Sequence, residues 1–292
     1  MAHRLRIGNV TITRIVERDG PWRAPHLMFP TADPAVARAH LRHMEPFIYD
    51  PVTDRLVITY QSFLVETPRH RILIDTCVGE NKPGRGAHMQ YPKEPWLAAF
   101  AATGVGFADI DYVFCTHLHV DHVGWNTRLD DGRWVPTFPN ARYIFSRAEY
   151  EAWRAEDAIG VHESGPHFRD SVLPIVEAGR AILVADDWQL EDQVWLTPTP
   201  GHSPAHVCVN IRSNGVHAVF TGDMMHHALQ CIEPDWSTCF CADPALAARS
   251  RRRVLGDWAD RDILVLPTHF PTPTAGRIVS LGDAWRFKFI GG

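Results

Sequence analysis

Four side chains that commonly bind metal ions fall within one six-residue stretch of this sequence: His117, His119, Asp121 and His122. Consecutive residues of an α-helix are rotated by about 100°, so His117 and His119 would point to nearly opposite sides of a helix. A loop, in contrast, can turn all four side chains inward. Imidazole and carboxylate groups at this spacing suit zinc or a similar divalent ion. The stretch therefore predicts a metal-binding loop.

The elements around this loop support the prediction. An apolar run at residues 110–115 precedes it and predicts a buried strand, so the motif begins where a strand ends. Strand ends are the usual place for chemistry in layered α/β proteins. Further metal-capable groups lie where later strand-like runs stop; they are His202 and His206 in the segment 199–206, Asp223 after an apolar run, and His269 after another.

The motif set resembles that of the metallo-β-lactamase superfamily. The order is HxHxDH, then GHSPAH, then GD, then a late histidine, and the match covers roughly residues 56 to 270. The resemblance implies an α/β fold, an αββα sandwich of two mixed β-sheets flanked by helices, and the order of strand-like and helix-like runs agrees with it. We therefore expect a single metallo-β-lactamase-like domain over residues 1–292.

The resemblance also implies a role for each of these residues, carried over position by position. One ion is expected at His117, His119 and His206, and a second at Asp121, His122 and His269, with Asp223 bridging the two. His202 matches a family position that is usually not a ligand, and Asp75 matches an aspartate that supports the metal loop. Two divalent ions are thus expected, most of all Zn, although such donors also accept Mn, Fe or Co.

Two metal ions at such a site predict hydrolysis. They can lower the pKa of a bridging water and stabilise the developing oxyanion, and Asp121 can transfer the proton to the leaving group. The sequence contains no GxSxG motif, so a serine hydrolase mechanism has no support. We expect a hydrolase of an ester or lactone, with phosphotriesters included in the range of such enzymes.

Branches of the superfamily differ at a few positions. The commonest class B β-lactamases carry Arg in place of His122 and Cys in place of Asp223, so β-lactams are disfavoured as substrates. Acyl-homoserine lactonases place a Tyr three residues after the bridging aspartate, where this chain has His226. The run from Gly222 to His226 is more similar to that of methyl-parathion-hydrolase-like enzymes, a branch that includes arylesterases, lactonases and phosphotriesterases.

Two other functions stay open. One is a mononuclear iron oxidoreductase like the persulfide dioxygenases, which use part of the same ligand set. The other is a glyoxalase II-like thioesterase, although only 23 residues follow His269 and that family carries a further helical domain. Metal content separates the first alternative from a dinuclear hydrolase, because it predicts one iron per chain instead of two zinc-like ions.

Several residues are expected near the substrate. His226 could donate a hydrogen bond to a substrate oxygen or supply a proton, and His227 is a competing candidate for that role. Trp22, Phe29 and Trp125 are candidates for an apolar wall, but packing in the core or in an interface is favoured for each. Residues 19–30 contain too many apolar side chains for a loop that is only solvated, and residues 17–50 are therefore a candidate lid or dimer-contact segment.

Composition limits the partners. The net charge of −5 and the absence of a basic region argue against nucleic acid, and no apolar run is long enough to span a membrane. The basic amino-terminal stretch lacks the apolar core of a secretory signal, and the six cysteines show no disulfide framework. We therefore expect a cytoplasmic protein that acts on a small molecule, with a homodimer left open.

Some local expectations can be tested against a structure. Helices are expected to begin after Asp33, Ser146 and Asp243, with Ser146 and Glu149 forming a capping box. Residues 19–30 are expected to form a loop. His162 and His167 are expected to be exposed, and so are the arginines Arg249, Arg251, Arg252 and Arg253.

Overall fold

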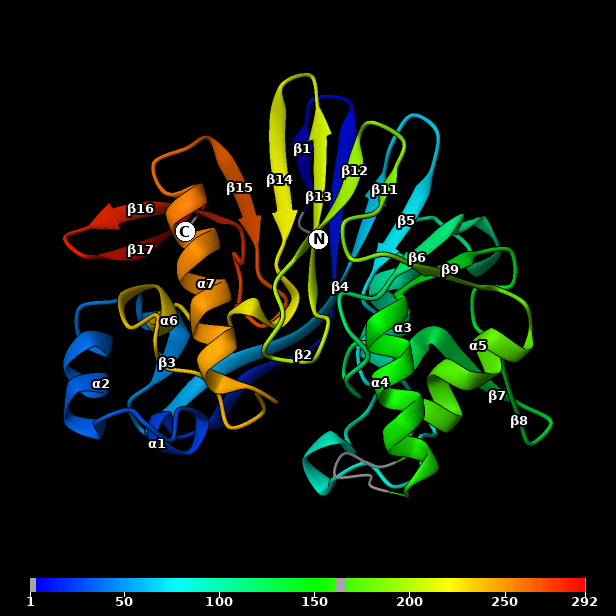
Figure 1. The fold of residues 1–292 in the computed structure, drawn as a ribbon, viewed down its shortest axis with the longest axis horizontal. Coiled ribbons are helices and arrows are strands. Elements are labelled where there is room, and N and C mark those ends of the chain that lie inside the picture. Colours follow the sequence, from blue (N-terminus) through cyan, green and yellow to red (C-terminus); the bar gives the residue numbers. More distant parts are fainter. Residues whose placement is uncertain (1–3, 161–165, 292) are drawn as a thin grey trace. The chain divides into compact units, whose positions relative to one another are not determined.

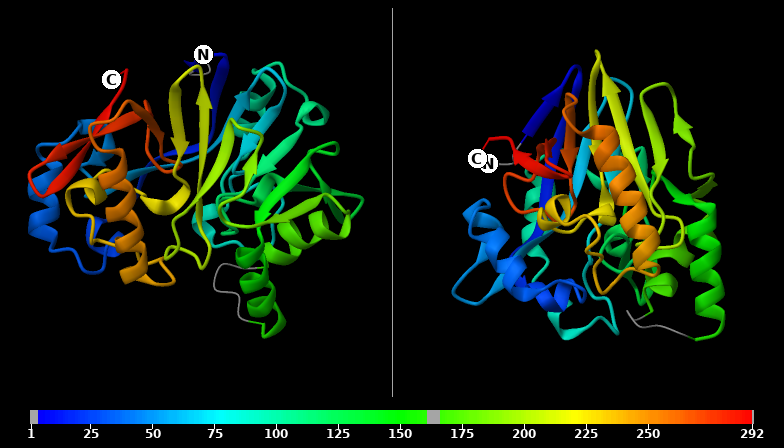
Figure 2. Two further views of the ribbon diagram at one scale, coloured as in Figure 1. Left: turned by 45° about the horizontal axis from the view of Figure 1, so that its top comes forward. Right: turned by 60° about the vertical axis from the view of Figure 1, so that its left-hand side comes forward.

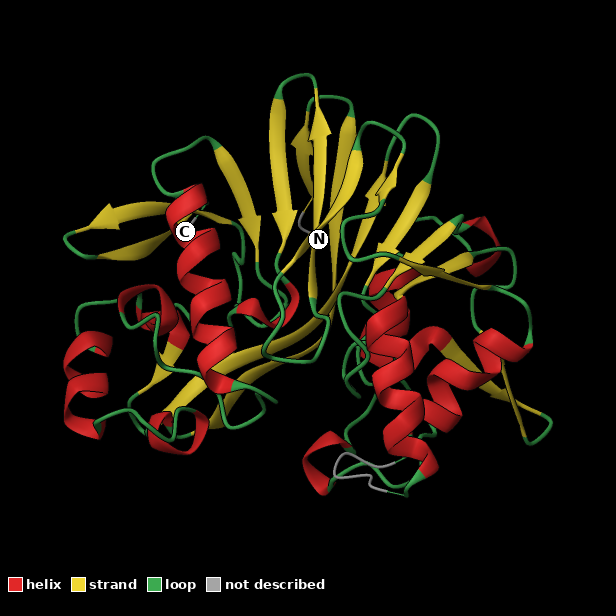
Figure 3. Cartoon of the chain, in the orientation of Figure 1, coloured by secondary structure: helices red, strands yellow, loops and turns green. Residues whose placement is uncertain are grey.

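The structure is a computed structural model that describes residues 4–160 and 166–291. The chain divides into two compact units, and each is described by itself. Unit 1 consists of residues 1–18 and 60–188, and unit 2 consists of residues 19–59 and 189–292. Both units contain strands and helices (Figure 3), which confirms the expected α/β class. The expectation of a single domain stays a prediction.

One β-sheet begins at the amino-terminal end of the described chain. Its strands are β1 (Arg4–Ile7), β2 (Val10–Arg23), β3 (Tyr49–Asp50), β4 (Arg55–Glu66), β5 (Arg71–Ile74), β6 (Tyr112–Phe114), β9 (Arg142–Ser146) and β10 (Ala181–Val184). Their order within the described residues is β1-β2-β4-β5-β6-β9-β10, with β3 paired to β4 (Figure 1). The pairs from β5 to β10 are parallel and β4–β5 is antiparallel, so the sheet is mixed.

The second β-sheet belongs to unit 2. Its strands are β11 (Gln189–Leu190), β12 (Val194–Pro198), β13 (Val207–Ser213), β14 (Val216–Phe220), β15 (Ile263–Leu266), β16 (Gly276–Leu281) and β17 (Ala284–Phe289), in that order. It is also mixed, because β14 and β15 are parallel while the other pairs are antiparallel. A small hairpin in unit 1 pairs β7 (Thr127–Asp130) with β8 (Arg133–Pro136). Two mixed sheets with helices are what the sequence predicts.

Helices pack on both sheets. They are α1 (Pro25–Met28), α2 (Pro34–Leu41), α3 (Glu94–Ala101), α4 (Arg147–Ala158), α5 (Leu173–Glu177), α6 (Leu229–Ile232) and α7 (Pro244–Trp258). In unit 1, α4 contacts β9 and β10. In unit 2, α7 contacts β16, and α6 contacts both α2 and β17 (Figure 2). The three expected N-caps are confirmed, since the side chains of Asp33, Ser146 and Asp243 each accept a backbone N–H of the helix that follows.

Each unit has its own hydrophobic core. The core of unit 1 includes Trp96, Trp125 and Phe138, and the core of unit 2 includes Met28, Phe29 and Trp258. Trp125 and Phe29, which could have formed an apolar wall, are therefore packed in the cores, the alternative that the sequence left open. In the structure all six cysteines are free thiols.

Several local expectations are wrong. Residues 19–23 continue β2, and α1 follows directly, so the segment 19–30 is not a loop. His167 and Arg251 are buried instead of exposed, because His167 packs against Trp153 and Arg251 donates to the backbone carbonyl of Met224. His162 and the first three residues lie outside the described residues.

Candidate metal centre

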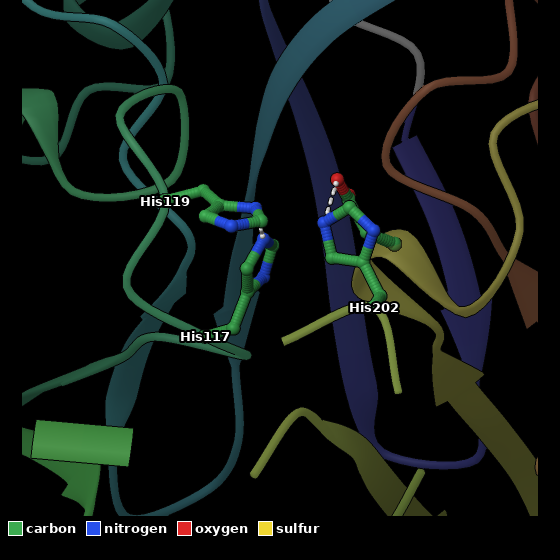
Figure 4. A group of neighbouring side chains, drawn as sticks. His117, His119 and His202 are labelled. Carbon is green, nitrogen blue, oxygen red and sulfur yellow. Dashed lines mark hydrogen bonds and ion pairs between the residues drawn. The ribbon is translucent and has the colours of Figure 1, made fainter. Parts of the chain in front are cut away.

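The loop after β6 brings the metal-capable side chains of unit 1 together. It runs from the end of β6 at Phe114 to a short 3₁₀ helix, η4 (Gly124–Asn126). Within it, Nε2 of His117 lies 2.9 Å from Nδ1 of His119, and Figure 4 shows these two rings turned toward each other. Two ring nitrogens that converge in this way can bind the same ion.

The opposite nitrogens of two loop histidines are held by neighbouring oxygens. Nδ1 of His122 lies 2.8 Å from Oδ2 of Asp75, and Nδ1 of His117 lies 3.1 Å from Oγ1 of Thr116. Nε2 of His122 lies 3.8 Å from the carboxylate of Asp121. Histidines that bind metals usually have their other nitrogen bonded to a carboxylate, a carbonyl or a water, which orients the ring. The loop therefore has the arrangement of a metal-binding loop.

Asp75 directly follows β5 and is buried completely. Besides its contact with His122, its carboxylate accepts the backbone N–H of Thr116 at 2.8 Å. Its backbone has a φ of +54°, a left-handed conformation that costs on the order of 1–3 kcal/mol in residues other than glycine. Backbone strain of this kind clusters at functional sites, and here it places one carboxylate against both ends of the metal loop.

A second carboxylate holds the middle of the same loop. Oε1 of Glu149 accepts the backbone N–H of Leu118 at 3.2 Å and the indole N–H of Trp153 at 2.8 Å. The Ser146 hydroxyl accepts the backbone N–H of Glu149, as the capping box predicts, but the carboxylate of Glu149 contacts the metal loop. The sequence showed Glu149 only as a helix-capping residue, because its contact to Leu118 is not local.

Asp223 is the centre of the donors in unit 2. It lies in a short 3₁₀ helix, η6 (Gly222–Met224), which follows β14. Oδ2 of Asp223 lies 3.1 Å from Nε2 of His202 and 3.0 Å from Nε2 of His226, and Oδ1 lies 3.0 Å from Nε2 of His269. Nδ1 of His269 lies 2.9 Å from the carbonyl oxygen of Thr59, so His269 too is oriented through its other nitrogen.

His202 takes the place that the sequence assigned to His206. Nε2 of His202 faces the carboxylate of Asp223, and Figure 4 shows its ring. Both ring nitrogens of His206 are engaged elsewhere: Nδ1 lies 2.8 Å from Oγ1 of Thr199, and Nε2 accepts the backbone N–H of Asp223 at 2.9 Å. The expected assignment, with His206 as a ligand and His202 as a supporting residue, differs from this arrangement.

The turn between β12 and β13 explains the difference. Thr199 donates its backbone N–H to the carbonyl of His206, so His206 stands at the base of the turn beside the start of β13. His202 lies at the tip of the turn. Gly201 has a φ of +124°, and a Cβ there would lie 2.1 Å from the backbone nitrogen of Ala247. Only glycine allows this close approach to α7, which directs His202 toward Asp223.

The structure also separates His226 from His227. Nε2 of His226 faces Asp223, and its ring stacks on that of His269 with centroids 5.0 Å apart. Nε2 of His227 lies 3.0 Å from the carbonyl of Ile48, and Nδ1 accepts the backbone N–H of Leu229. His227 is therefore a structural residue, and His226 is the one that lies with the metal-capable donors.

Burial and charge shift the pKa of these histidines in different directions. Burial lowers the pKa of His226 to about 4, although Asp223 opposes the shift, and burial lowers the pKa of His227 to about 4. Burial also acts to lower the pKa of His202, but the charge and hydrogen bond of Asp223, together with the Cys241 thiol, raise it to about 9. In the absence of a cation, His202 is thus the histidine that carries the charge opposite Asp223.

Aromatic side chains lie beside the donors of unit 2. The ring of Phe240 is 6.3 Å from that of His226, and it is 39% exposed. Trp22 lies 5.8 Å from Phe240, and the guanidinium of Arg23 lies over both rings. Of the three expected wall residues, Trp22 is therefore the one that lies near the donors of unit 2. Phe240 is a further neighbour that the sequence did not single out.

The two sets of donors fit divalent metal ions. Histidine nitrogens and carboxylate oxygens are the ligands that zinc and similar ions prefer. His117, His122 and His269 are each held through one ring nitrogen by an oxygen atom, which leaves the other nitrogen to bind a metal. Mixed sheets with such donors at the strand ends are typical of a metal-dependent enzyme, and this is the class of protein that the fold and the donors indicate.

Comparison with known proteins identifies the family. The model of the metallo-beta-lactamase superfamily matches residues 58–269, which is more than half of the chain. The protein therefore belongs to this superfamily, as the motifs indicate.

The curated relatives that it matches are N-acyl homoserine lactonases. That of Bacillus cereus is 28% identical over 156 residues, which cover 49% of this chain and 54% of the lactonase. The chain thus spans about half the length of the curated relatives it matches.

Solved structures share the fold over nearly the whole chain. The hydrolase AbOPH, of the beta lactamase superfamily, aligns with a TM-score of 0.83 and 22% identity over 100% of this chain and 98% of its own. AidC, a dizinc quorum-quenching lactonase in complex with the product N-hexanoyl-L-homoserine, aligns with a TM-score of 0.77 and 19% identity over 99% and 98%. The likeness shows that the chain has the metallo-β-lactamase fold.

Proposed function

We propose that this protein is a dinuclear, metal-dependent hydrolase of esters or lactones. The observation that carries the proposal is the cluster around Asp223, where the Nε2 atoms of three histidines lie within 3.1 Å of one carboxylate. The proposed ligands Asp223 and His269 have their donor atoms within 4.8 Å of each other and of that of His226. Such a dense group of buried imidazoles is costly in a folded protein unless it serves a cation or a reaction.

The donors of each unit are proposed to bind divalent ions. In unit 1, His117 and His119 would bind one ion and Asp121 and His122 a second; in unit 2, the proposed donors are His202, Asp223 and His269. The family model spans residues 58–269, and all of these donors lie within that range. Two carboxylates against two divalent ions leave the site positively charged, which favours a polarised carbonyl oxygen.

When bound, such ions polarise a carbonyl group and lower the pKa of a water molecule. The chain's own residues would complete the reaction. Asp121, whose side chain is 14% exposed, can take up a proton and deliver it to the leaving group. Nε2 of His226 lies 3.0 Å from the carboxylate of Asp223, and when Asp223 binds metal instead, the Nε2–H group of His226 would be available to donate to the oxyanion that develops on the substrate.

Lactones are the substrate class that we favour. The curated relatives are N-acyl homoserine lactonases, and AidC carries an N-acyl homoserine as product. In unit 2, the partly exposed ring of Phe240 beside His226 offers an apolar contact for an acyl chain. Zinc is the proposed metal, and the protein is proposed to be cytoplasmic, with a homodimer left open. No helix in the described part of the chain has both the length and the hydrophobicity to cross a membrane.

An activity panel on purified protein of known metal content tests the proposal. The panel contains N-acyl homoserine lactones of different chain length, aryl esters, a thioester and a phosphotriester. We expect two zinc-like ions per chain, turnover of a lactone or ester, and loss of turnover after chelation with recovery on adding Zn²⁺. One iron per chain with no hydrolysis of any substrate would contradict the proposal.

A further inference from the structure

Glu17 is a buried carboxylate that the motif analysis did not include. It lies in β2 and is 3% exposed. Oε1 accepts the backbone N–H of Gly79 at 3.1 Å and the indole N–H of Trp125 at 2.8 Å. Oε2 accepts the backbone N–H of Val78 at 3.1 Å and the hydroxyl of Tyr91 at 2.7 Å.

These contacts make Glu17 a hub between separate segments of unit 1. Each of its two oxygens accepts two donors, and Nζ of Lys93 lies 3.9 Å from Oε2. Burying a carboxylate is costly unless it is paired and hydrogen-bonded, and Glu17 satisfies both conditions. A buried glutamate without these donors would destabilise the fold. The hydrogen bonds therefore indicate that Glu17 holds in place the segments that donate to it.

The segment that Glu17 holds runs along the end of the metal loop. The backbone N–H of Thr76 donates to the carbonyl of His122, and the Thr76 hydroxyl does the same. The N–H groups of Gly124 and Trp125 donate in turn to the carbonyls of Cys77 and Thr76. Residues 76–79 and 122–125 are therefore tied together directly after the HxHxDH motif.

Two glycines let these segments approach so closely. A Cβ on Gly124 would lie 1.9 Å from the backbone of Val78, and a Cβ on Gly79 would lie 2.5 Å from the backbone of Gly124. No side chain fits between the segments, so their separation is set by the backbone. Glu17 accepts from Val78 and Gly79 on one segment and from Trp125 on the other, and it thereby clamps this contact.

We propose that Glu17 is a positioning residue for the metal ligand His122. Asp75 orients the His122 ring through Nδ1, and Glu17 fixes the backbone on which that ring stands, through Thr76 and Trp125. The proposal rests on the proposed metal site, because it assigns Glu17 to the ion that His122 would bind. Glu17 itself is not a ligand.

Metal titration of the variant Glu17→Gln tests the proposal. Gln keeps the shape of the side chain but replaces one acceptor oxygen by an NH₂ group, which opposes the donors Val78 and Tyr91 or Gly79 and Trp125. The metal-free protein is titrated with Co²⁺, whose visible absorption reports the ligand geometry, and with Zn²⁺. We expect one of the two ions, the one assigned to His122, to lose about 10-fold in affinity, as is typical when a residue that supports a ligand is altered. The other ion is expected to bind as in the wild type.

Asp170→Asn is the matched control. Asp170 is another buried carboxylate of unit 1, and it accepts from Arg85 without contacting the residues of the clamp. We expect it to lower the thermal midpoint as Glu17→Gln does, with both metal affinities unchanged. A purely structural Glu17 would behave like this control, so a folded Glu17→Gln with wild-type affinities overturns the proposal.

Two further results keep the outcome clear. If Glu17→Gln does not fold, Tyr91→Phe removes one donor to Oε2, and a smaller shift in the same direction is expected; wild-type affinities in that variant overturn the proposal. Wild-type protein that binds a single ion or none contradicts the proposed function instead, before any variant is compared.

Discussion

The metal-capable residues of unit 1 and those of unit 2 are assembled in different ways. In unit 1 they come from six consecutive residues of one loop, and carboxylates from other elements, Asp75 and Glu149, hold that loop. In unit 2 they come from separate strand ends, and a carboxylate at the centre, Asp223, gathers them. The donors of unit 1 are held by carboxylates of surrounding elements, whereas the donors of unit 2 are held by a carboxylate among them. Substitutions of these carboxylates are therefore expected to have different consequences in the two units.

Asp223→Ala is expected to have the largest effect. It removes the group around which His202, His226 and His269 converge, so at least one ion per chain and nearly all hydrolysis should be lost. Metal analysis after gel filtration and steady-state kinetics measure both. Asp235→Asn, at an exposed ion pair with Arg252 in the same unit, is the control. Two tightly held ions with normal turnover in Asp223→Ala would remove Asp223 from the site.

His202→Ala and His206→Ala test which of these two histidines of unit 2 is the metal ligand. His202 faces Asp223 directly, so its loss should abolish tight binding of one ion. His206 acts on the backbone of Asp223 and should weaken binding by about 10- to 100-fold, as supporting residues do. Isothermal titration with Zn²⁺ compares the two variants. The reverse order of effects would restore His206 as the ligand.

His226→Ala tests whether one residue of the Asp223 cluster serves the substrate instead of the metal. Both ions and the fold should remain, while kcat falls by about 10²- to 10³-fold, the usual effect of removing a donor to an oxyanion. KM should change much less. Kinetics on metal-quantified protein decide the matter, and an unchanged kcat for the best substrate would exclude His226 from the reaction.

Asp75→Asn tests the outside support of unit 1. An amide in place of the carboxylate keeps the size but weakens the contacts to Thr116 and His122, so one ion should bind about 10- to 100-fold more weakly. The other ion should be retained, because His117 and His119 stay in place. If both ions weaken equally in a Zn²⁺ titration, the two ions do not divide the loop as proposed.

His227→Gln should change how the stability of the protein depends on pH, and it should leave metal binding unchanged. Burial lowers the pKa of His227 from 6.5 to about 4, so the unfolded chain binds a proton between these values that the folded chain does not. Stability from this group is present above pH 6.5 and declines as the pH falls toward 4, by on the order of 3 kcal/mol. Urea unfolding between pH 4 and 7 should show a flatter profile in His227→Gln, and an equally steep one would contradict this role.

The local features of the fold were predictable because they depend on neighbouring residues. The caps Asp33, Ser146 and Asp243 each act on a backbone group two or three residues away. Arg251 was not predictable as a buried residue. Its guanidinium satisfies the carbonyls of Met224 and Pro234, which come near α7 only through the tertiary structure. A run of charged residues on a helix predicts a solvent-exposed face unless such distant acceptors are known.

The sequence by itself determined the family, the kind of donors and the metal loop of unit 1, because four donors in six residues can converge only through the loop that carries them. Tertiary structure decided which of His202 and His206 faces Asp223, and that His226 and not its neighbour His227 does so. In both pairs the residue types are identical and the spacing is short. Their directions depend on the close approach of Gly201 to α7 and on the carbonyl of Ile48, contacts that lie far apart along the chain.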